Sequence, residues 1–384
     1  LYGRLGRYET AADLLGLAVA NRRLPGGEVA QLATSLYELG VVRRRVGQLD
    51  ASEALHREAH RLRLSLRPAD DWAVAESLNE LGLVAWARAD AVGAEKLHRE
   101  TLALRRAVIA ERDDPSLDLT SSLNNLALAL RDQGRPDEAL PLLEELLTRR
   151  RARHGEPHSR VVTALGNLAH VYVALGRTAE AEPLYRGALA QARELFDADH
   201  PRVARAVRNL AVNLRDQGQL EAAVPLARQS LDLWSRRLGP DHPETLAGRR
   251  HLAITLRLAG ELDEAERQIS ESLDRRRAGT VPEHPDWALD LTELAEVKAG
   301  RGDIDEAIGA ARRALELHRR LLDDGHPRVA AGFFLLGRLL AERGQTGPAA
   351  EAFGASLERL VAIHGPGHER VLSVQTRLES LSEP

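Results

Sequence analysis

The sequence predicts an all-α protein, an α-solenoid of about nine helical hairpins with a capping helix at its C-terminal end. Three observations lead to this fold class: glycines recur every 42 residues, apolar side chains flank each glycine at helical spacing, and His-Pro pairs separate the units. Aromatic residues make up 3% of the chain against 43% for all apolar residues, so Leu, Ala and Val must build most of the interior. Such a core suits helices that pack closely together.

A column of glycines sets the repeat. Its regular members are Gly134, Gly176, Gly218, Gly260, Gly302 and Gly344. Ala89, Gly47 and Gly6 continue the column towards the N-terminus, with three extra residues near Asp113 to Pro115. Glycine reaches positive φ values without steric cost, so each column position predicts the turn between two helices. The predicted single domain, residues 1–384, has units at about 1–28, 29–70, 71–115, 116–157, 158–199, 200–241, 242–283, 284–325 and 326–367, and a cap at 368–384.

Each unit carries two amphipathic segments. In the fifth unit the apolar residues are Leu165, Leu168, Ala169 and Tyr172 before the turn, and Ala181, Tyr185, Ala188 and Leu189 after it. This spacing is that of helices with one buried face. A lone hairpin leaves much of its apolar surface in water, so each unit is expected to pack on the next. We expect the chain to begin in the last turn of a first helix before Gly6, and residues 370–381 to form a lone first helix that caps the array.

Histidine marks the start of each later unit. The members of this column are His158, His200, His242, His284, His326 and His368, and proline follows four of them directly. Proline is tolerated in the first turn of a helix, so these pairs predict helix starts. Neighbouring helices pack about 8 to 10 Å apart, whereas zinc ligands lie about 2 Å from one ion. We therefore expect a structural column and predict no metal site, also not at His56 and His60, which lack an evident third ligand.

Composition argues against several classes of function. Lys and Arg total 53 against 57 for Asp and Glu, a formal net charge of −4 that does not fit a general nucleic-acid binder. Without cysteine there is no disulfide framework and no thiolate nucleophile, which is compatible with a cytoplasmic location. No apolar run approaches the length of a membrane span. Because the chain has no methionine, we expect it to be a piece of a longer protein.

No catalytic motif stands out. The sequence has no Gly-x-x-x-x-Gly-Lys phosphate loop, no Gly-x-Gly-x-x-Gly turn and no Gly-x-Ser-x-Gly elbow. Carboxylate pairs such as Glu144 and Glu145 are expected on an exposed surface, where burial cannot move their pKa values apart. We predict that this segment is not an enzyme, with no catalytic residues and no cofactor.

Several residues carry a resemblance to a known family. Leu39-Gly40 and Leu336-Gly337, together with Ala181 and Tyr185, resemble the tetratricopeptide (TPR) pattern. The 42-residue period, the His-Pro linkers and the Asn-Leu-Ala triplets at 125, 167 and 209 are similar to the kinesin-light-chain type of repeat. The resemblance implies a right-handed superhelix whose first helices line a concave groove that holds extended peptides. It also implies a bacterial signalling setting, as the tail of a serine/threonine kinase or a nucleotide-binding switch protein.

Candidate peptide-binding residues follow from this groove. The places 10, 9, 6 and 3 before each turn lie opposite the buried stripe of the first helix, and Arg205 stands one turn earlier. The candidates are Asn124, Asn125, Arg131, Asn167, His170, Arg205, Arg208, Asn209, Arg215, Arg250, His251 and Arg257. Asn amides can pair with a peptide backbone, and Arg can grip a carboxylate with two hydrogen bonds. These residue types favour an acidic, extended segment.

The same side chains also fit roles that involve no ligand. The arginines can belong to an ordinary solvated face, and the asparagines can bond neighbouring helices. Tyr37, Trp86 and Phe334 also face the groove by this count, either as apolar pockets or as core residues. The first functional hypothesis is a scaffold that binds a protein or peptide, without nucleic acid or membrane. The alternative is a regulatory tail that acts on an upstream domain of the same protein or associates with a second copy.

Overall fold

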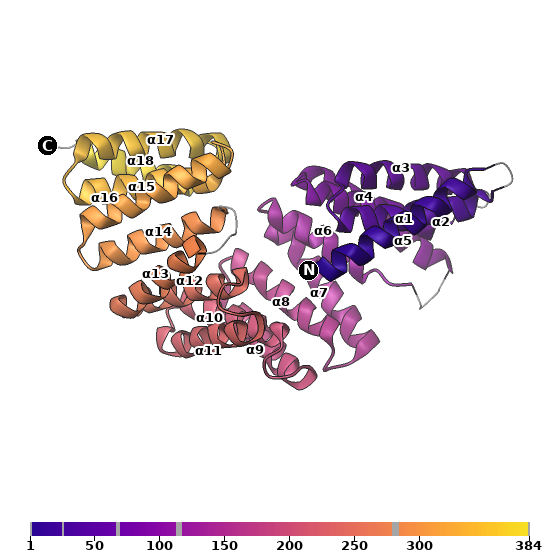
Figure 1. Ribbon diagram of the computed structural model, residues 1–384, viewed down its shortest axis with the longest axis horizontal. Helices are drawn as coiled ribbons and strands as arrows, with labels where there is room; N and C mark the ends of the chain where they lie inside the picture. The colour runs from indigo at the N-terminus through magenta and orange to yellow at the C-terminus, as the bar shows by residue number, and fades with distance from the viewer. Residues whose placement is uncertain (1, 25–26, 67–69, 113–116, 279–283, 383–384) are drawn as a thin grey trace. The chain divides into compact units, whose positions relative to one another are not determined.

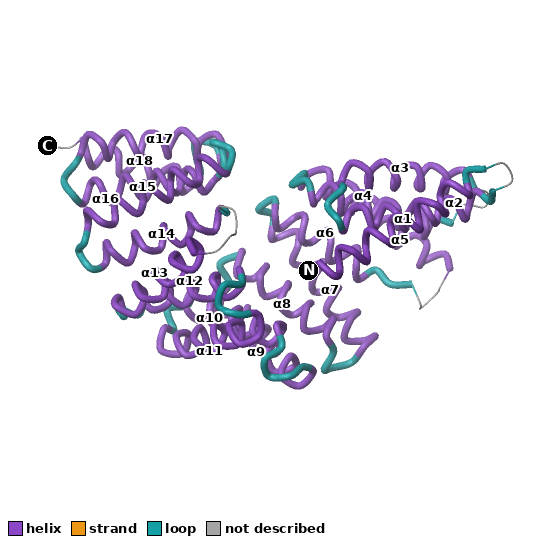
Figure 2. Tube along the Cα trace, in the orientation of Figure 1, coloured by secondary structure: helices purple, strands orange, loops and turns teal. Residues whose placement is uncertain are grey.

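The computed structural model describes residues 2–24, 27–66, 70–112, 117–278 and 284–382. Within these ranges the chain forms eighteen α-helices and no strand, as Figures 1 and 2 show. The chain is therefore an α-solenoid, as the sequence predicts. The insertion expected near Asp113 to Pro115 lies outside the described residues. In the described part of the chain, no helix is both long and apolar enough to cross a membrane.

First and second helices alternate along the chain. The first helices are α2 (Val29–Arg45), α4 (Asp71–Ala87), α6 (Thr120–Asp132), α8 (Ser159–Ala174), α10 (Pro201–Asp216), α12 (Pro243–Leu258), α14 (Pro285–Gly300), α16 (Pro327–Glu342) and α18 (Glu369–Ser382). The second helices are α1 (Tyr2–Arg22), α3 (Leu49–Ser65), α5 (Ala91–Arg112), α7 (Pro136–His154), α9 (Thr178–Leu195), α11 (Leu220–Leu238), α13 (Leu262–Ala278), α15 (Ile304–Leu321) and α17 (Thr346–His364).

The helices gather into two compact units, residues 1–191 and 192–384, called here the N-terminal and the C-terminal unit. Within each unit every helix packs against its neighbours in the chain, as α4 does against α5 and α16 against α17. The prediction of one domain over residues 1–384 stays a prediction.

The turns confirm the glycine column. Its members from Gly134 to Gly344, and Gly47 before them, have φ values between 72° and 83°. Ala89 holds the same left-handed conformation at φ 61°, so its place in the column was correctly identified. Gly6 was not: it lies inside the continuous helix α1, and the turn expected there is wrong. A glycine within a helix costs only about 1 kcal/mol, which the rest of a 21-residue helix can absorb.

Histidine caps the later first helices. In all six members of the column, Nδ1 accepts a hydrogen bond from the backbone N–H two residues on, at 3.1 to 3.2 Å. This bond satisfies one of the amides that the start of a helix leaves unpaired. The predicted helix starts and the structural role of the column are confirmed.

Small residues let the two helices of a hairpin approach closely. The alanines five places after the turns, from Ala94 to Ala349, are fully buried. Three first helices carry a glycine where the second helix carries a ring: Gly40 faces His56, Gly82 faces His98 and Gly337 faces Phe353. A Cβ at any of these glycines would lie 2.5 to 2.8 Å from a ring atom. The core of each hairpin therefore depends on the fit between a small residue and a large one.

Candidate binding surface on the first helices

The predicted groove positions are partly covered. Ten of the twelve candidates are half-buried, and only His170 and Arg205 are exposed. The half-buried ones lie where successive first helices approach one another, so their polar groups can bond across helices as well as meet a ligand.

In the N-terminal unit the asparagines form a chain of amide hydrogen bonds. Asn125 donates to Asn79 at 3.0 Å, linking α6 to α4, and Asn167 donates to Asn124 at 2.7 Å, linking α8 to α6. Asn124 and Asn125 are joined by a longer contact of 3.5 Å. The asparagines thus bond neighbouring helices, one of the two roles that the sequence left open. Asn79 belongs to this chain and was not among the candidates.

Trp86 and Arg131 lie at the end of the same helices. The indole Nε1 of Trp86 donates to Asp132 at 2.8 Å, and the side chain of Trp86 remains 44% exposed. Arg131 donates two hydrogen bonds to Asp132, at 2.7 and 3.0 Å. On α8, His170 packs edge-on against the ring of Tyr185, with 5.5 Å between ring centroids. Trp86 is therefore the one large exposed aromatic among the described groove residues of this unit.

In the C-terminal unit three candidate arginines pair with carboxylates of the next first helix. Arg208 on α10 contacts Glu244 on α12 at 2.9 Å. Arg250 and Arg257 on α12 contact Asp290 and Glu293 on α14, both at 2.7 Å. Asp290 is fully buried and also accepts from Arg276 and Ser272. Sequence reasoning missed these acidic partners, although a separation of 36 residues between Arg and Glu recurs at Arg44 and Glu80.

The remaining candidates of this unit surround His251. Burial lowers the pKa of His251 to about 3, and Arg208, Arg250 and Arg215 lower it further, so the ring is neutral. Arg215 bonds Asp216, while its Nη1 is buried without a hydrogen-bond partner among the described residues. Burial also raises the pKa of Glu293, against the opposing effect of Arg257. The cluster is a tightly coupled mixture of cations and anions rather than a purely basic surface.

Two candidates remain open to a ligand. Arg205 is exposed and Asn209 is half-buried, and neither forms a hydrogen bond or ion pair with any residue that the structure describes. Both lie on α10, beside Arg208, whose guanidinium already holds one carboxylate.

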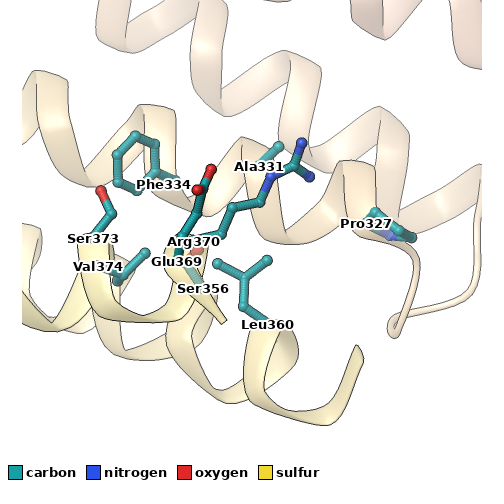
Figure 3. A pocket seen from close by; sticks show the side chains of 9 residues that line it. All are labelled: Pro327, Ala331, Phe334, Ser356, Leu360, Glu369, Arg370, Ser373 and Val374. Carbon is teal, nitrogen blue, oxygen red and sulfur yellow. The ribbon is translucent and has the colours of Figure 1, made fainter. Parts of the chain in front are cut away.

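A cavity of about 420 Å³ opens between α16, α17 and α18 in the C-terminal unit (Figure 3). Its lining is Pro327, Ala331, Phe334, Ser356, Leu360, Glu369, Arg370, Ser373 and Val374. Phe334 was expected to face the groove, and it does line this cavity. Its ring also contacts Phe353 of the hairpin core, with 5.7 Å between centroids. Both roles that the sequence left open for this aromatic are therefore filled at once.

Among curated proteins, no sequence matches the chain. Solved structures do match. TPR-like repeats of a putative kinesin light chain from Podosopora anserina are 24% identical over 53% of this chain and 97% of that one, with a TM-score of 0.48. A Rap protein, solved in complex with competence and sporulation factor, is 14% identical over 91% and 99%, with a TM-score of 0.55. The quorum sensor NprR of B. thuringiensis is 13% identical over 100% and 98%, with a TM-score of 0.56.

Family models give the assignment. One tetratricopeptide-repeat model matches residues 118–186, 160–234, 203–278 and 288–362, and a second matches residues 74–115. These matches cover more than half of the 384 residues. They also coincide with the hairpins that the structure shows. The chain belongs to the tetratricopeptide-repeat family.

Proposed function

We propose that the chain is a non-catalytic interaction module that holds an extended segment of a protein or peptide on its first helices. The observation that carries this proposal is the surface of α10, where exposed Arg205 and half-buried Asn209 stand beside Arg208. Membership of the tetratricopeptide-repeat family supports it. The Rap structure, solved with a bound factor, supports it as an example of the same fold.

An acidic segment fits this surface best. Arg205 offers a guanidinium to solvent, and Arg208 is 22% exposed while it contacts Glu244 at 2.9 Å. A ligand carboxylate can share Arg208 with Glu244, because a guanidinium has five N–H donors. Arg250 and Arg257 are less available, since they hold the buried carboxylates of Asp290 and Glu293. The ligand charge is therefore assigned to α10 and not to the whole row of arginines.

A peptide-display selection on the full chain tests this proposal. We expect acidic sequences to be enriched, and the enrichment to disappear in the double variant Arg205→Gln with Arg208→Gln. Arg237→Gln is the matched control, because Arg237 is exposed on the second helix α11. The acidic assignment fails if the double variant selects the same sequences as the parent. The module assignment fails if no sequence is enriched on any of the three proteins.

The second candidate function is a regulatory or sensor segment that contacts a further domain or a second copy. The observation that favours it is the apolar surface of α1, where Leu14 and Leu17 are 63% and 69% exposed. Paired exposed leucines on one helix are typical of a contact surface. Sedimentation of the chain and of Leu14→Gln with Leu17→Gln tests self-association. A parent chain that stays monomeric at high concentration contradicts the second-copy form of this candidate.

A further inference from the structure

The contacts between hairpins contain a column of side chains that reach across. We call the contact between a second helix and the first helix that follows it a joint. At each joint the side chain 16 places after the turn projects towards the next first helix. Its members include Arg63, Arg105, Arg150, Trp234, Arg276, His318 and Leu360. What fills this position differs from joint to joint, and the difference follows the residue it faces.

Arginine fills the position where the next helix offers a polar partner. Arg63 donates to Ser77 at 2.9 Å and its guanidinium lies 4.6 Å from the ring centroid of Tyr37. Arg105 donates to Ser122 at 2.7 Å, and Arg276 to Asp290 at 2.7 Å. Ser77, Ser122 and Asp290 occupy equivalent places on their helices, twelve before the turn. Arg150 is the exception, since it donates to the backbone carbonyl of Arg160.

A neutral ring fills the position where that partner is missing. Gly248 and Gly332 stand at the equivalent place in the next two cases, and neither can accept from a side chain. The facing residues are Trp234 and His318, which are only 2% and 3% exposed. Burial lowers the pKa of His318 to about 4, and Arg328 lowers it further, so this ring is uncharged. A joint without an acceptor is thus closed by an uncharged aromatic ring.

The last joint has neither arrangement. Leu360 takes the place of the ring and Val374 the place of the acceptor, and the cavity of Figure 3 lies between them. Phe334 stands at the place that Tyr37 holds beneath Arg63, and Arg370 at the place of Arg328. A cation is disfavoured here, because Val374 offers no acceptor and Arg370 lies at the mouth. By comparison with the other joints, the missing group is an uncharged ring.

We propose that this cavity binds the uncharged aromatic side chain of a partner peptide, in the place that Trp234 fills within the chain at the joint of α11 and α12. Its volume of about 420 Å³ accommodates an indole, and it opens at Ala331, Arg370 and Ser373, which are all exposed. Ligand pockets of about 300 to 1,000 Å³ with an apolar floor and few polar groups are common. The Arg370 guanidinium bonds no described residue and can lie over the bound ring.

This inference rests on the proposed function, because it names one side chain of the bound segment. A first experiment does not depend on any peptide. N-acetyl-tryptophanamide is titrated into the full chain with methyl-labelled Leu and Val, and the signals of Leu360 and Val374 are followed by NMR. We expect these signals to shift with saturation, and N-acetyl-argininamide to leave them unchanged. No shift with the tryptophan probe, or an equal shift with both probes, overturns the inference.

Two variants locate the probe. Leu360→Trp fills the cavity from within, so the affinity for N-acetyl-tryptophanamide falls by about tenfold or more. Ser373→Phe narrows the exposed mouth without touching the core and gives the same loss, which keeps the test valid if Leu360→Trp folds poorly. Leu258→Trp is the control, because Leu258 is exposed on α12. Binding that survives both cavity variants contradicts the assignment.

The peptide source of the ring is tested by display selection. We expect aromatic residues to be enriched on the parent chain and on Leu258→Trp, and to lose their enrichment on Leu360→Trp. Acidic enrichment that persists without aromatic enrichment overturns this inference and leaves the proposed function standing. Probe binding without aromatic peptides overturns the peptide source and identifies a site for free aromatic molecules. Loss of every enriched peptide on the parent contradicts the proposed function itself.

Discussion

A methyl group on Gly40 of α2 would lie 2.6 Å from Nε2 of His56 on α3. The imidazole occupies the space that any other residue would need, and His56 is fully buried. The pair shows how one hairpin is held together: a residue without a side chain on the first helix, and a ring against it from the second.

Gly40→Ala is therefore expected to destabilise the protein by about 1 to 3 kcal/mol, the usual effect of an overpacked core. Gly16→Ala is the control, since Gly16 lies in α1 with nothing within 4 Å of a Cβ. Alanine has the higher helix propensity, so that control gains up to about 1 kcal/mol. Urea denaturation of both variants measures the difference. Equal effects of the two substitutions would refute the close fit.

Ala89→Gly is expected to stabilise the chain. Ala89 holds φ 61°, a left-handed conformation that costs a non-glycine residue about 1 to 2 kcal/mol. The greater freedom of glycine in the unfolded chain returns about 0.5 to 1 kcal/mol of this, so the net gain is about 0.5 to 1 kcal/mol. Gly176→Ala, at φ 74°, makes the opposite change and should lower the urea midpoint. A loss of stability in Ala89→Gly contradicts the strain at this turn.

The histidine caps predict a difference between two substitutions at one site. Nδ1 of His200 accepts from the N–H of Arg202 at 3.1 Å. His200→Ala removes this acceptor and costs about 1 kcal/mol, whereas His200→Asn supplies another cap and costs little. Thermal denaturation at pH 7 distinguishes them. If both variants lose the same stability, the ring contributes through its packing on Phe196 and not as a cap.

Acid is expected to destabilise the fold below neutrality. Burial lowers the pKa of His56 and of His98 to about 4, from 6.5 for the free side chain. Above pH 6.5 the rings are neutral in the folded and the unfolded chain, and they add no pH dependence. Between pH 6.5 and about 4 only the unfolded chain takes up these protons, so stability falls with pH and then levels off.

His98→Leu isolates one of these rings. We expect its free energy of unfolding to change less between pH 7 and pH 5 than that of the parent chain. His170→Gln is the control, because His170 is exposed on α8. Parallel urea titrations at the two pH values give the comparison. A pH dependence that is the same in parent and His98→Leu would show that His98 is not buried in its neutral form.

The amide chain of the N-terminal unit predicts coupling between helices. Asn124→Ala leaves the amide of Asn167 without its acceptor, and we expect a loss of about 1 kcal/mol. Asn167→Ala should cost a similar amount, and the double variant less than the sum, because the two residues share one hydrogen bond. A double-mutant cycle by urea denaturation measures this coupling. Strict additivity would place the asparagines among independent surface residues.

The fold was open to prediction because its signals are local. A turn every 42 residues and an apolar stripe on either side of it identify the hairpins without any knowledge of long-range contacts. Ala89 was placed by spacing alone, and its φ of 61° confirms the assignment. Gly6 shows the limit of the same reasoning. Spacing alone does not reveal whether a helix passes through a glycine, and α1 does so.

The binding surface was less open to prediction. Helical periodicity identifies which face carries Arg257, but the partner of Arg257 lies 36 residues away on another hairpin. Long polar side chains choose between ligand, solvent and neighbouring helix according to distances that a single sequence does not contain. The cavity at Leu360 left a visible trace, since this residue breaks a column of arginines and rings. Its meaning became clear only when the partners of that column were known.

The most direct test of the central claim is to map where a selected peptide lies. Peptides enriched by display on the full chain are given a benzophenone side chain, cross-linked by light and located by mass spectrometry. Binding on the first helices predicts adducts on α10 and α12 and around the cavity of α16 and α18. Adducts confined to the outer surfaces of the second helices, such as α11 and α15, would contradict it.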